Sequence, residues 1–426
     1  MGLKSISRKH GIDGAYTLHI TYVLRVLLSG VILLGALLSG AVSARAELVI
    51  DKNLPAGNIF VERVEGDTVY LRNELRDTAG WWFYWAFRVK GAVGRTLTFR
   101  FTNGEPVSTR GPCVSLDRGT NWVYAADSFT TSAFTYTFPP EDVEAWFAMG
   151  MSYTQRDWEA FLAKHAAHGA FFETGTLCLS REGRAVENAR FGCINQPPAY
   201  RVWLSARHHA AEMMASYVLE GILDAVLADT ELGTWMRGNV EFMVVPFVDK
   251  DGVEDGDQGK NRKPHDHNRD YDQFLYPETA AITNWIAAHA QNKLDVVLDI
   301  HCPWIRGKYN EWLYQVYTKD SANAAAQRRM GEILEAVQRG GMDYKVANDL
   351  PFGQSWNTAA NYGAGRSFKM WVLDRVPANR VSTTYEVPFA TANSATVTRA
   401  SCREFGGDTA VAFRQFLLET DGVPKP

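Results

Sequence analysis

Cysteine is scarce in this sequence, with five residues among 426, and no two cysteines have the Cys-x-x-Cys spacing. A zinc site built from cysteines is therefore disfavoured, because such sites normally contain closely spaced pairs. The odd number leaves at least one thiol unpaired or paired between chains. Cys178 and Cys193 flank the turn-like segment 181–184, so we expect a disulfide between these two in an oxidising compartment.

An excess of positive charge is also lacking. The chain has 44 Lys and Arg residues against 48 Asp and Glu residues, which gives a formal net charge of -4. A general nucleic-acid binder normally needs a basic surface, so this class of function is disfavoured. The hydrophobic content of 46% and charged content of 22% are those of an ordinary globular protein, and the length suggests two domains with ample core.

One long apolar run stands near the N-terminus. Basic residues up to Arg25 precede the run 26–42, and Ala44-Arg45-Ala46, with a small residue at each end, follows it. This order is typical of a secretory signal peptide, which we predict at residues 1–46, with export to the periplasm or the medium. An uncleaved anchor is the alternative, and it is the one route to membrane association that the sequence suggests.

Residues 47–150 contain short segments rich in β-branched and aromatic side chains. They lie at 69–72, 82–89 and 96–101, and Gly, Asn and Asp separate them. Strands at this spacing without helical periodicity predict an antiparallel β-sandwich domain. A carbohydrate-binding module would also be rich in aromatic residues, but packing in a core explains them more simply.

The pattern changes after Pro139-Pro140, and strand-like and helix-like segments alternate through residues 151–426. We expect strands at 202–204, 242–248, 294–300, 313–317 and 384–387, and helices at 157–168, 212–227, 278–290, 322–339 and 408–419. This alternation predicts an α/β catalytic domain with a mixed, largely parallel sheet flanked by helices.

Polar side chains stand at the ends of three of these strands. His209 and Glu212 follow the first, His301 follows another within Asp299-Ile300-His301, and Glu386 follows the last. Functional groups of α/β sheets gather where strands end. A single histidine there is best explained as a satisfied core residue. Two histidines and a carboxylate at neighbouring strand ends instead predict a His₂Glu zinc site of the catalytic type.

A long polar loop, residues 249–271, lies between these strand ends. It contains Lys260, Arg262 and the pair Asn268-Arg269, and it ends at Tyr271. A solvated surface loop is the simple interpretation. However, a planar guanidinium beside an amide suits the two-pronged recognition of a carboxylate, which favours a binding role.

Together these motifs resemble those of the zinc carboxypeptidase family, which contains carboxypeptidase A. Residues 209–212 (His-Ala-Ala-Glu) are similar to the family's His-Pro-Gly-Glu, residues 266–269 (Asp-His-Asn-Arg) to its Asp-x-Asn-Arg, and 246–252 to its Pro-x-x-Asn-Pro-Asp-Gly. The sequence looks most like the branch of the cytosolic carboxypeptidases and their bacterial relatives, which also carry a β domain before the catalytic one. The resemblance covers nearly all of the chain after residue 46.

The resemblance implies one Zn²⁺ per chain and a role for each residue around it. His209, Glu212 and His301 would bind the zinc ion, with His209 rather than the adjacent His208 because only His209 has the family's spacing. Asp266 would accept a hydrogen bond from the distal nitrogen of His209. Glu386 would act as the general base that takes a proton from a zinc-activated water.

The resemblance also implies a set of groups that bind the substrate. Arg262 would stabilise the oxyanion, with Lys260 as its rival, because the spacing of Arg262 from Arg269 differs from that in carboxypeptidase A. Asn268 and Arg269 would hold the terminal carboxylate of a peptide or protein, and Tyr362 matches the family's mobile tyrosine. If nearby Arg366 lined the specificity pocket, an acidic terminal residue would be favoured.

The function predicted from these residues is that of a zinc metallocarboxypeptidase, which hydrolyses the C-terminal peptide bond of its substrate. One alternative is an exported amidase or endopeptidase acting on cell-wall peptides, which would need no clamp for a terminal carboxylate. Another is a catalytically inactive peptide-binding pseudoenzyme. The Asn268-Arg269 pair argues against the first alternative, and retention of the three ligands with Glu386 argues against the second.

Overall fold

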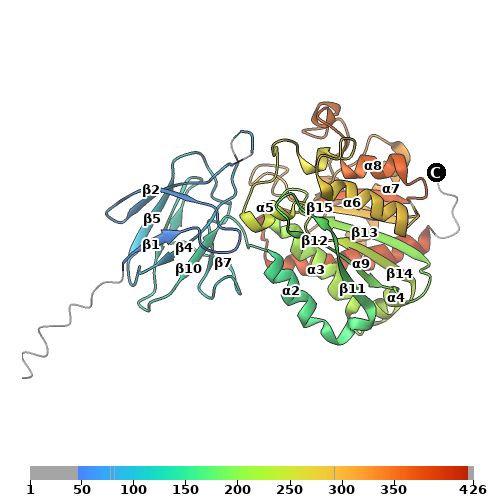
Figure 1. Cartoon of the computed structure of the whole chain (residues 1–426), viewed down its shortest axis with the longest axis horizontal. Coiled ribbons are helices and arrows are strands. Elements are labelled where there is room, and N and C mark those ends of the chain that lie inside the picture. The colour runs from blue at the N-terminus through green and yellow to red at the C-terminus, as the bar shows by residue number, and fades with distance from the viewer. Residues whose placement is uncertain (1–46, 77, 81, 292, 421–426) are drawn as a thin grey trace, which may run out of the picture. The chain divides into compact units, whose positions relative to one another are not determined.

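The computed structural model describes residues 47–76, 78–80, 82–291 and 293–420 (Figure 1). The described residues from Leu48 onward group into one compact unit, and the description below concerns this unit. The predicted signal segment 1–46 lies outside the described residues. Among the described residues, no helix is both long enough and apolar enough to cross a membrane.

The strands of the first hundred described residues form two five-stranded sheets. One has the order β1 (Val49–Asp51), β4 (Ala86–Lys90), β10 (Ala145–Ala148), β6 (Cys113–Ser115), β7 (Val123–Tyr124). The other has the order β2 (Phe60–Glu65), β3 (Thr68–Arg72), β5 (Thr96–Phe101), β9 (Ala133–Thr137), β8 (Ser128–Phe129). Neighbouring strands are antiparallel except β3 and β5, which run parallel, so the expectation of a wholly antiparallel arrangement is wrong at this pair.

Phenylalanine rings join the two sheets face to face as a β-sandwich. Phe87 and Phe147 of one sheet meet Phe99 of the other with ring centroids 5.2 and 5.3 Å apart, and Phe134 lies 5.6 Å from Phe147. Alternation along β5, where every second residue is buried, places these rings inside. The expected strand 82–89 begins only at Ala86, so residues 82–85 precede it without belonging to the sheet.

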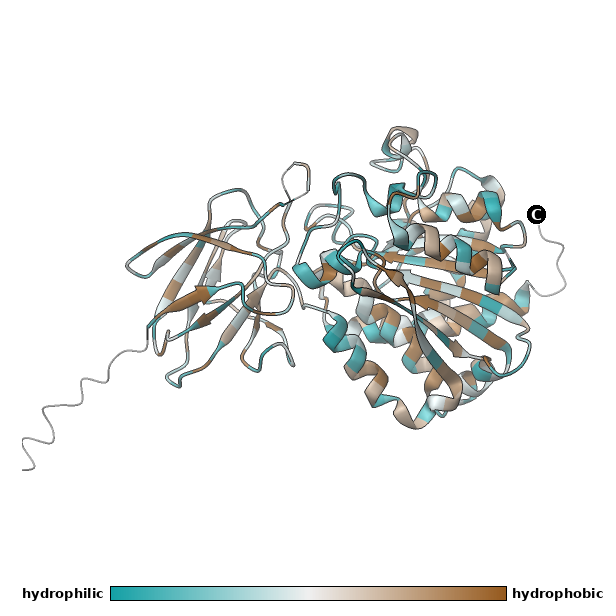
Figure 2. Ribbon diagram, viewed as in Figure 1, coloured by the Kyte–Doolittle hydropathy of each residue, from teal (hydrophilic) through white to brown (hydrophobic). Residues whose placement is uncertain are grey.

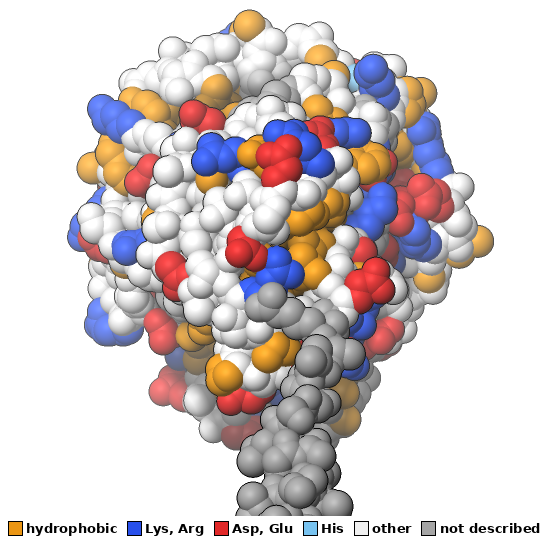
Figure 3. Space-filling view, turned by 90° about the vertical axis from the view of Figure 1, so that its left-hand side faces the viewer, with side chains coloured by type: hydrophobic (Ala, Val, Ile, Leu, Met, Phe, Trp, Pro, Cys, Tyr) orange, Lys and Arg blue, Asp and Glu red, His pale blue; other side chains and the backbone are white. Residues whose placement is uncertain are grey.

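The outer surface of this part of the chain is charged and mixed in sign. Figure 3 shows acidic and basic side chains interspersed with hydrophobic ones on the face turned to the viewer. Charged side chains of the sandwich pair across the strands, as Arg88 does with Asp51 at 2.7 Å and Lys90 with Glu144 at 2.9 Å. These pairs remain partly accessible to water, so they contribute little to stability but keep the surface polar.

The later strands form one seven-stranded mixed sheet. Its order is β11 (Phe172–Leu179), β12 (Ala185–Gly192), β14 (Val240–Val245), β13 (Tyr200–Ala206), β15 (Val296–His301), β17 (Val381–Glu386), β16 (Tyr314–Gln315). The four strands β14, β13, β15 and β17 are parallel to one another, and the outer three pair antiparallel. The prediction of a mixed sheet is therefore confirmed. Figure 2 shows the central strands as largely hydrophobic, as burial on both faces requires.

Helices cover both faces of this sheet. They are α2 (Gln155–Lys164), α3 (Met213–Leu227), α4 (Glu231–Asn239), α5 (Lys250–Asp255), α6 (Pro277–His289), α7 (Ser321–Val337), α8 (Phe368–Arg375) and α9 (Arg399–Glu419). Val202 and Leu204 of β13 pack in the core with α3, α7 and α9, whereas Trp203 packs on the other face with α6 and α8. The alternation of side chains along a strand thus gives one sheet two apolar cores.

Helices α3 and α9 cross at very close range. A Cβ atom at Gly406 would lie 2.3 Å from the carbonyl oxygen of Val218, and one at Gly221 would lie 2.1 Å from that of Arg403. Glycine at both places therefore lets the two backbones touch. Helix α9 begins at Arg399, nine residues before the expected start, and the contact at Gly406 belongs to this additional part.

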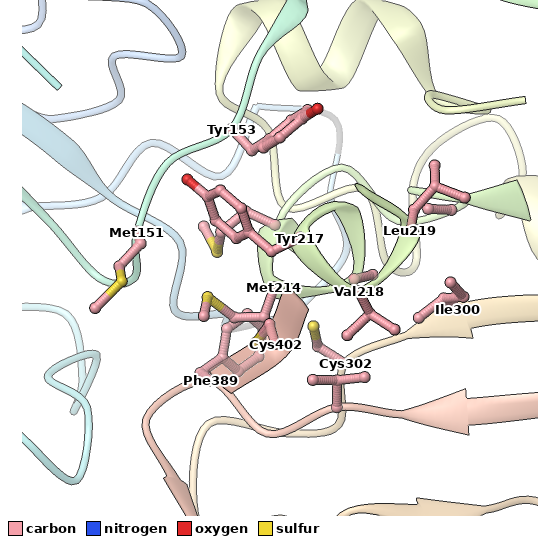
Figure 4. Packing of buried hydrophobic residues seen from close by; sticks show 14 of the residues in the cluster. Met151, Tyr153, Met214, Tyr217, Val218, Leu219, Ile300, Cys302, Phe389 and Cys402 are labelled. Atoms are coloured by element: carbon pink, nitrogen blue, oxygen red, sulfur yellow. The ribbon is translucent and has the colours of Figure 1, made fainter. Parts of the chain in front are cut away.

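All five cysteines are free thiols in the structure, so the predicted Cys178–Cys193 disulfide is wrong. In the hairpin of β11 and β12, Cys178 pairs with Val186 near the turn, whereas Cys193 follows the far end of β12. The two cysteines therefore lie at opposite ends of the hairpin. Figure 4 shows Cys302 and Cys402 among apolar side chains such as Met214, where both behave as small buried hydrophobic residues.

Candidate active site

The ends of parallel strands bring the predicted metal ligands together. The register of β15 and β17 places His301 opposite Glu386, and the register of β13 and β15 places Ala206 opposite Ile300. The loop that follows β13 therefore runs beside the end of β15. Glu212 lies on this loop at the N-cap of α3.

A buried arginine shapes the loop between β13 and α3. Arg207 has a left-handed backbone with φ of 63°, which an arginine adopts only when its surroundings impose it. Its side chain is 2% exposed and donates hydrogen bonds to the carbonyl oxygens of Ala210 (2.8 Å) and Tyr153 (2.9 Å). These bonds hold the turn that carries His209 in one conformation.

Three ligand atoms converge at the centre of the site. The Nδ1 atoms of His209 and His301 lie 3.2 Å apart, and the carboxylate of Glu212 faces them at 2.7 and 2.8 Å. On the outer side, Nε2 of His209 donates to Asp266 at 3.1 Å, and Nε2 of His301 donates to Asp299 at 2.7 Å. With Nε2 as the donor, each ring can direct the lone pair of Nδ1 inward once that nitrogen is deprotonated, which is the form that binds a metal.

The charges of this cluster favour a cation at its centre. Burial alone would raise the pKa of Glu212, but His209 and His301 hold that pKa well below its ordinary value. Burial would lower the pKa of His301, yet the carboxylates of Asp299 and Glu212 outweigh it and raise that pKa. Two imidazole nitrogens and one carboxylate form a donor set that fits zinc with an open coordination position.

His208 lies in the same buried region but has a separate function. Its Nδ1 donates to Asp299 at 2.8 Å, and its Nε2 accepts a hydrogen bond from the hydroxyl of Tyr271 at 2.7 Å. Burial lowers its pKa, so the ring is neutral and both nitrogens are engaged. His208 and Ser205, which donates to Asp299 at 2.8 Å, therefore fix the carboxylate that orients His301.

No function was assigned to Asp299 from the sequence, but the structure shows its carboxylate in contact with His208 and His301. Its position two residues before His301 at the end of a buried strand was the available signal. Residues i and i+2 of a strand point to the same face, so an Asp-x-His segment there can pair its carboxylate with its own imidazole.

A cavity of about 330 Å³ opens over the ligand cluster. The predicted residues that line it are His209, Glu212, His301, Asn268, Arg269, Tyr362 and Glu386, together with Lys260. Glu386 is 7% exposed, and burial raises its pKa to about 7. A carboxylate with such a pKa can both accept and return a proton near neutral pH.

Asn268 and Arg269 line one part of the cavity from η2 (His267–Arg269), a short helix that Asp266 caps. The amide oxygen of Asn268 accepts a hydrogen bond from the backbone N–H of Phe368 at 3.0 Å. The guanidinium of Arg269 donates to the carbonyl oxygen of Asn361 at 3.1 Å and lies 5.0 Å from the ring centre of Tyr362. Backbone contacts thus fix the orientation of both side chains.

The structure does not bring Arg262 to the cavity. Its guanidinium forms ion pairs with two buried carboxylates, those of Asp249 and Asp257, and its side chain is 8% exposed. Lys260 lines the cavity instead, with Nζ 3.0 Å from Asp266 and 3.4 Å from Nε2 of His209. The buried carboxylates explain the difference, since they hold the guanidinium where its charge is compensated.

Arg366 is likewise absent from the described residues that line the cavity. It pairs with Asp374 at 2.9 Å, and its side chain is 33% exposed. The basic side chain that this segment contributes to the cavity is Lys369, which is 5% exposed and donates to the carbonyl oxygen of Val316 at 2.6 Å. Burial lowers the pKa of Lys369 to about 7.

Comparison with known families finds a match to the zinc carboxypeptidase family over residues 158–274. The matched segment contains His209, Glu212 and the 266–269 motif, while His301 and Glu386 lie beyond it.

Among curated proteins, an uncharacterised protein of Zymomonas mobilis is 23% identical over 263 residues, which cover 60% of this chain and 67% of that protein. Human cytosolic carboxypeptidase 2 is 30% identical over 155 residues, which cover 34% of this chain and 17% of that protein. The chain therefore aligns with only a small part of the cytosolic carboxypeptidases that it matches.

Solved structures of bacterial metallo-carboxypeptidases share the fold over most of the chain. The enzyme from Burkholderia cenocepacia superposes with a TM-score of 0.73 at 19% identity, covering 88% of this chain and 100% of that one. The metallo-carboxypeptidase from Pseudomonas aeruginosa gives a TM-score of 0.69 at 18% identity, covering 87% and 99%. The predicted resemblance is confirmed at this level: the segment 158–274 matches the zinc carboxypeptidase family, and the chain has the fold of the bacterial metallo-carboxypeptidases. His209, Glu212 and His301 form a cluster that could hold the predicted metal ion.

Proposed function

We propose that the protein is a zinc-dependent metallocarboxypeptidase that hydrolyses the C-terminal peptide bond of peptide substrates. The observation that carries the proposal is the convergence of His209, Glu212 and His301 in one cavity with Glu386 and the Asn268-Arg269 pair. A bound zinc ion would supply a Lewis acid and lower the pKa of a water molecule beside it. The same cavity offers a base for that proton and cations for the substrate.

The residues around the cavity divide the proposed reaction among them. Glu386 takes a proton from the attacking water and returns it to the leaving amine, for which the raised pKa suits it. Asn268 and Arg269 hold the terminal carboxylate, since a fixed guanidinium beside an amide suits a planar anion. Lys260, rather than Arg262, faces the negative charge that develops on the carbonyl oxygen, and its position at the cavity supports this assignment.

The position of Lys369 supports a preference for an acidic terminal residue. This buried amine lines the same cavity as Asn268 and Arg269, and a glutamate or aspartate side chain entering there would satisfy its charge. The proposal replaces the role considered for Arg366. Lys369→Met is expected to lower the kcat/KM ratio between peptides ending in Glu and in Gln, whereas Arg366→Met leaves that ratio unchanged.

The test of the proposed function is a panel of peptides that differ in C-terminal residue and in amidation. The zinc-loaded enzyme is expected to release the last residue only from peptides with a free carboxylate. Arg269→Ala is expected to raise KM for these peptides and to spare amidated ones. Equal cleavage of free and amidated peptides would instead support the amidase or endopeptidase alternative, and no cleavage with zinc bound would support the pseudoenzyme.

We also propose that the protein is exported. The support is the basic, apolar and small-residue order of residues 1–46. Fractionation of cells that produce the full chain tests it, since activity in the periplasm or medium is expected and retention in the cytosol would contradict it.

A further inference from the structure

The cavity has an aromatic wall that the proposed reaction does not use. Trp82 and Phe83 precede strand β4 of the β-sandwich, and Trp304 follows β15 three residues after His301. The ring centre of Trp304 lies 4.9 Å from that of Trp82 and 5.0 Å from that of Phe83, the latter edge to face. Phe83 also packs edge to face on Phe389 at 5.5 Å. The β-sandwich and the part of the chain built on the seven-stranded sheet thus both contribute residues to one wall.

Hydrogen bonds attach this wall firmly to the loop of the metal ligands. The side-chain oxygen of Gln258 accepts from the backbone N–H groups of Phe83 (3.2 Å) and Tyr84 (2.9 Å). The backbone carbonyl of Gln258 accepts from the N–H of Ala211, between the ligands His209 and Glu212, at 3.2 Å. One buried glutamine therefore fixes the aromatic wall and the ligand loop to each other.

The β-sandwich holds the neighbouring residues of this loop as well. Asn58 donates to the carbonyl oxygen of Gly256 at 2.6 Å, and Arg76 pairs with Asp257 at 2.8 Å. The segment 256–260, which ends at Lys260 in the cavity, is thus bound to the sandwich at three successive residues. The wall is consequently preorganised, and a ligand that enters the cavity meets it without a loss of loop entropy.

The wall presents an apolar surface to the cavity. The indole N–H of Trp82 donates to the carbonyl oxygen of Ala79 at 3.0 Å, so the polar atom of this ring is satisfied within its own loop. The carboxylate-binding pair, Asn268 and Arg269, comes from different elements and bonds instead to Phe368 and Asn361. The cavity therefore has a polar part for a terminal carboxylate and a separate aromatic part.

We propose that Trp82, Phe83 and Trp304 form a subsite for an apolar or aromatic side chain on the residue that precedes the terminal one. The inference rests on the proposed function. It assigns the aromatic part of the cavity to the substrate residue on the N-terminal side of the scissile bond. Flat aromatic rings bind apolar side chains by burial and by edge-to-face contact. Filling such a pocket changes kcat/KM by about tenfold to a hundredfold between a large and a small side chain.

Two acetylated dipeptides test the subsite with the full zinc-loaded chain. Both carry the terminal residue that the peptide panel selects, and the preceding residue is Phe in one and Ala in the other. The wild-type enzyme is expected to favour the Phe peptide about tenfold or more in kcat/KM. Trp304→Ala and Trp82→Ala are expected to bring the ratio close to one, whereas Trp304→Phe retains most of it.

Val123→Ala serves as the control, because Val123 lies in the same sandwich with its side chain 60% exposed and should leave the ratio unchanged. A wild-type ratio near one overturns the subsite, and so does an equal loss on both peptides in the Trp variants. If neither peptide is cleaved, the proposed function fails by itself. Calorimetric binding of the two dipeptides to Glu386→Gln then tests the subsite without turnover, with tighter binding of the Phe peptide expected and equal binding contradicting it.

Discussion

The interior of the β-sandwich and the carboxyl edge of the seven-stranded sheet are equally well buried but differ in chemistry. In the sandwich, rings such as Phe99 and Phe147 are fully buried and pack on other aromatic rings across the two sheets. At the sheet edge, His301, Asp299 and Glu212 are 2, 1 and 7% exposed, and their charges are compensated by one another. Burial of apolar rings stabilises the folded sandwich. At the sheet edge, the interactions between the charged groups must offset the cost of removing those groups from water.

This difference shows where each region tolerates change. The apolar interior is sensitive to lost volume, because packed rings leave a cavity when one is removed. The charged edge is sensitive to lost partners, because a single deletion leaves a buried group uncompensated. Substitutions in the sandwich should therefore affect stability, and substitutions at the edge should affect metal binding or turnover.

The largest effect is expected for Glu386→Gln at the sheet edge. The amide has the shape of the carboxyl group but cannot accept the proton of the attacking water. We expect kcat to fall by about 10²–10⁴-fold while one zinc ion per chain is retained. Steady-state kinetics and metal analysis measure the two quantities, with Glu159→Gln on α2 as the control. Undiminished kcat would remove Glu386 as the base.

Phe147→Ala should show the converse pattern in the sandwich. Removal of a ring that contacts Phe87, Phe99 and Phe134 leaves a cavity in a closely packed core. We expect the free energy of unfolding to fall by about 3–5 kcal/mol, with zinc content unchanged in the folded protein. Denaturant unfolding checks this, and Val123→Ala, at an exposed position of the same sandwich, should cost less than about 0.5 kcal/mol. Loss of zinc before unfolding would contradict the expectation that substitutions in the sandwich affect stability and not metal binding.

Asp299→Asn tests whether the edge depends on compensation of charge. Asp299 accepts from His208 and His301, so its loss disturbs the tautomer and the orientation of a metal ligand. We expect zinc affinity to fall by about 10–100-fold, measured by competition with a chelator. Asp374→Asn, with a side chain 54% exposed, is the matched control. Equal zinc affinity in the two variants would exclude a role for Asp299 in metal binding.

The smallest effect concerns Glu278 in α6, a buried carboxyl outside the cavity. Burial, with the charges of Asp249 and Asp251 adding to it, raises its pKa to about 8. Between about pH 4.5 and 8 the unfolded chain ionises this group and the folded chain does not, so the free energy of unfolding falls as pH rises. We expect Glu278→Gln to flatten this slope by up to about 1.4 kcal/mol per pH unit in denaturant titrations at several pH values. An unchanged slope would show that Glu278 is already ionised in the native state.

The central strands could be predicted from the sequence because their burial is nearly complete. Residues 242–248 form an uninterrupted apolar run and 294–300 are apolar except for Asp295 and Asp299, and the structure places β14 and β15 in these regions. Helix α4, which contains Gly233 and Gly238, gave no such signal, because glycine lowers helix propensity. The early turns of α9 were missed for the same reason, since Gly406 serves a close contact between helices that only the tertiary structure reveals.

The candidate ligands could be predicted because each stands at a strand end with a fixed spacing. The surrounding groups could not, because loop geometry decides them. Lys260 and Arg262 are two residues apart, but Asn261 between them has a left-handed backbone with φ of 52°, and their side chains reach different partners. The contribution of Trp304 to the cavity depends on its contacts with the sandwich, a distant part of the chain.

The hydrogen bonds of Gln258 and Asn58 and the ion pair of Arg76 mean that the boundary near residue 150 is a poor place to divide the chain in protein engineering. A shortened chain that began there would keep every predicted ligand, yet the segment 256–260 would lose all three attachments to the sandwich. Fusion, domain exchange or truncation at this boundary would separate the β-sandwich from the segment 256–260, which is hydrogen-bonded to the loop of the metal ligands. A change in the β-sandwich at these contacts is therefore expected to reach the loop that carries the metal ligands.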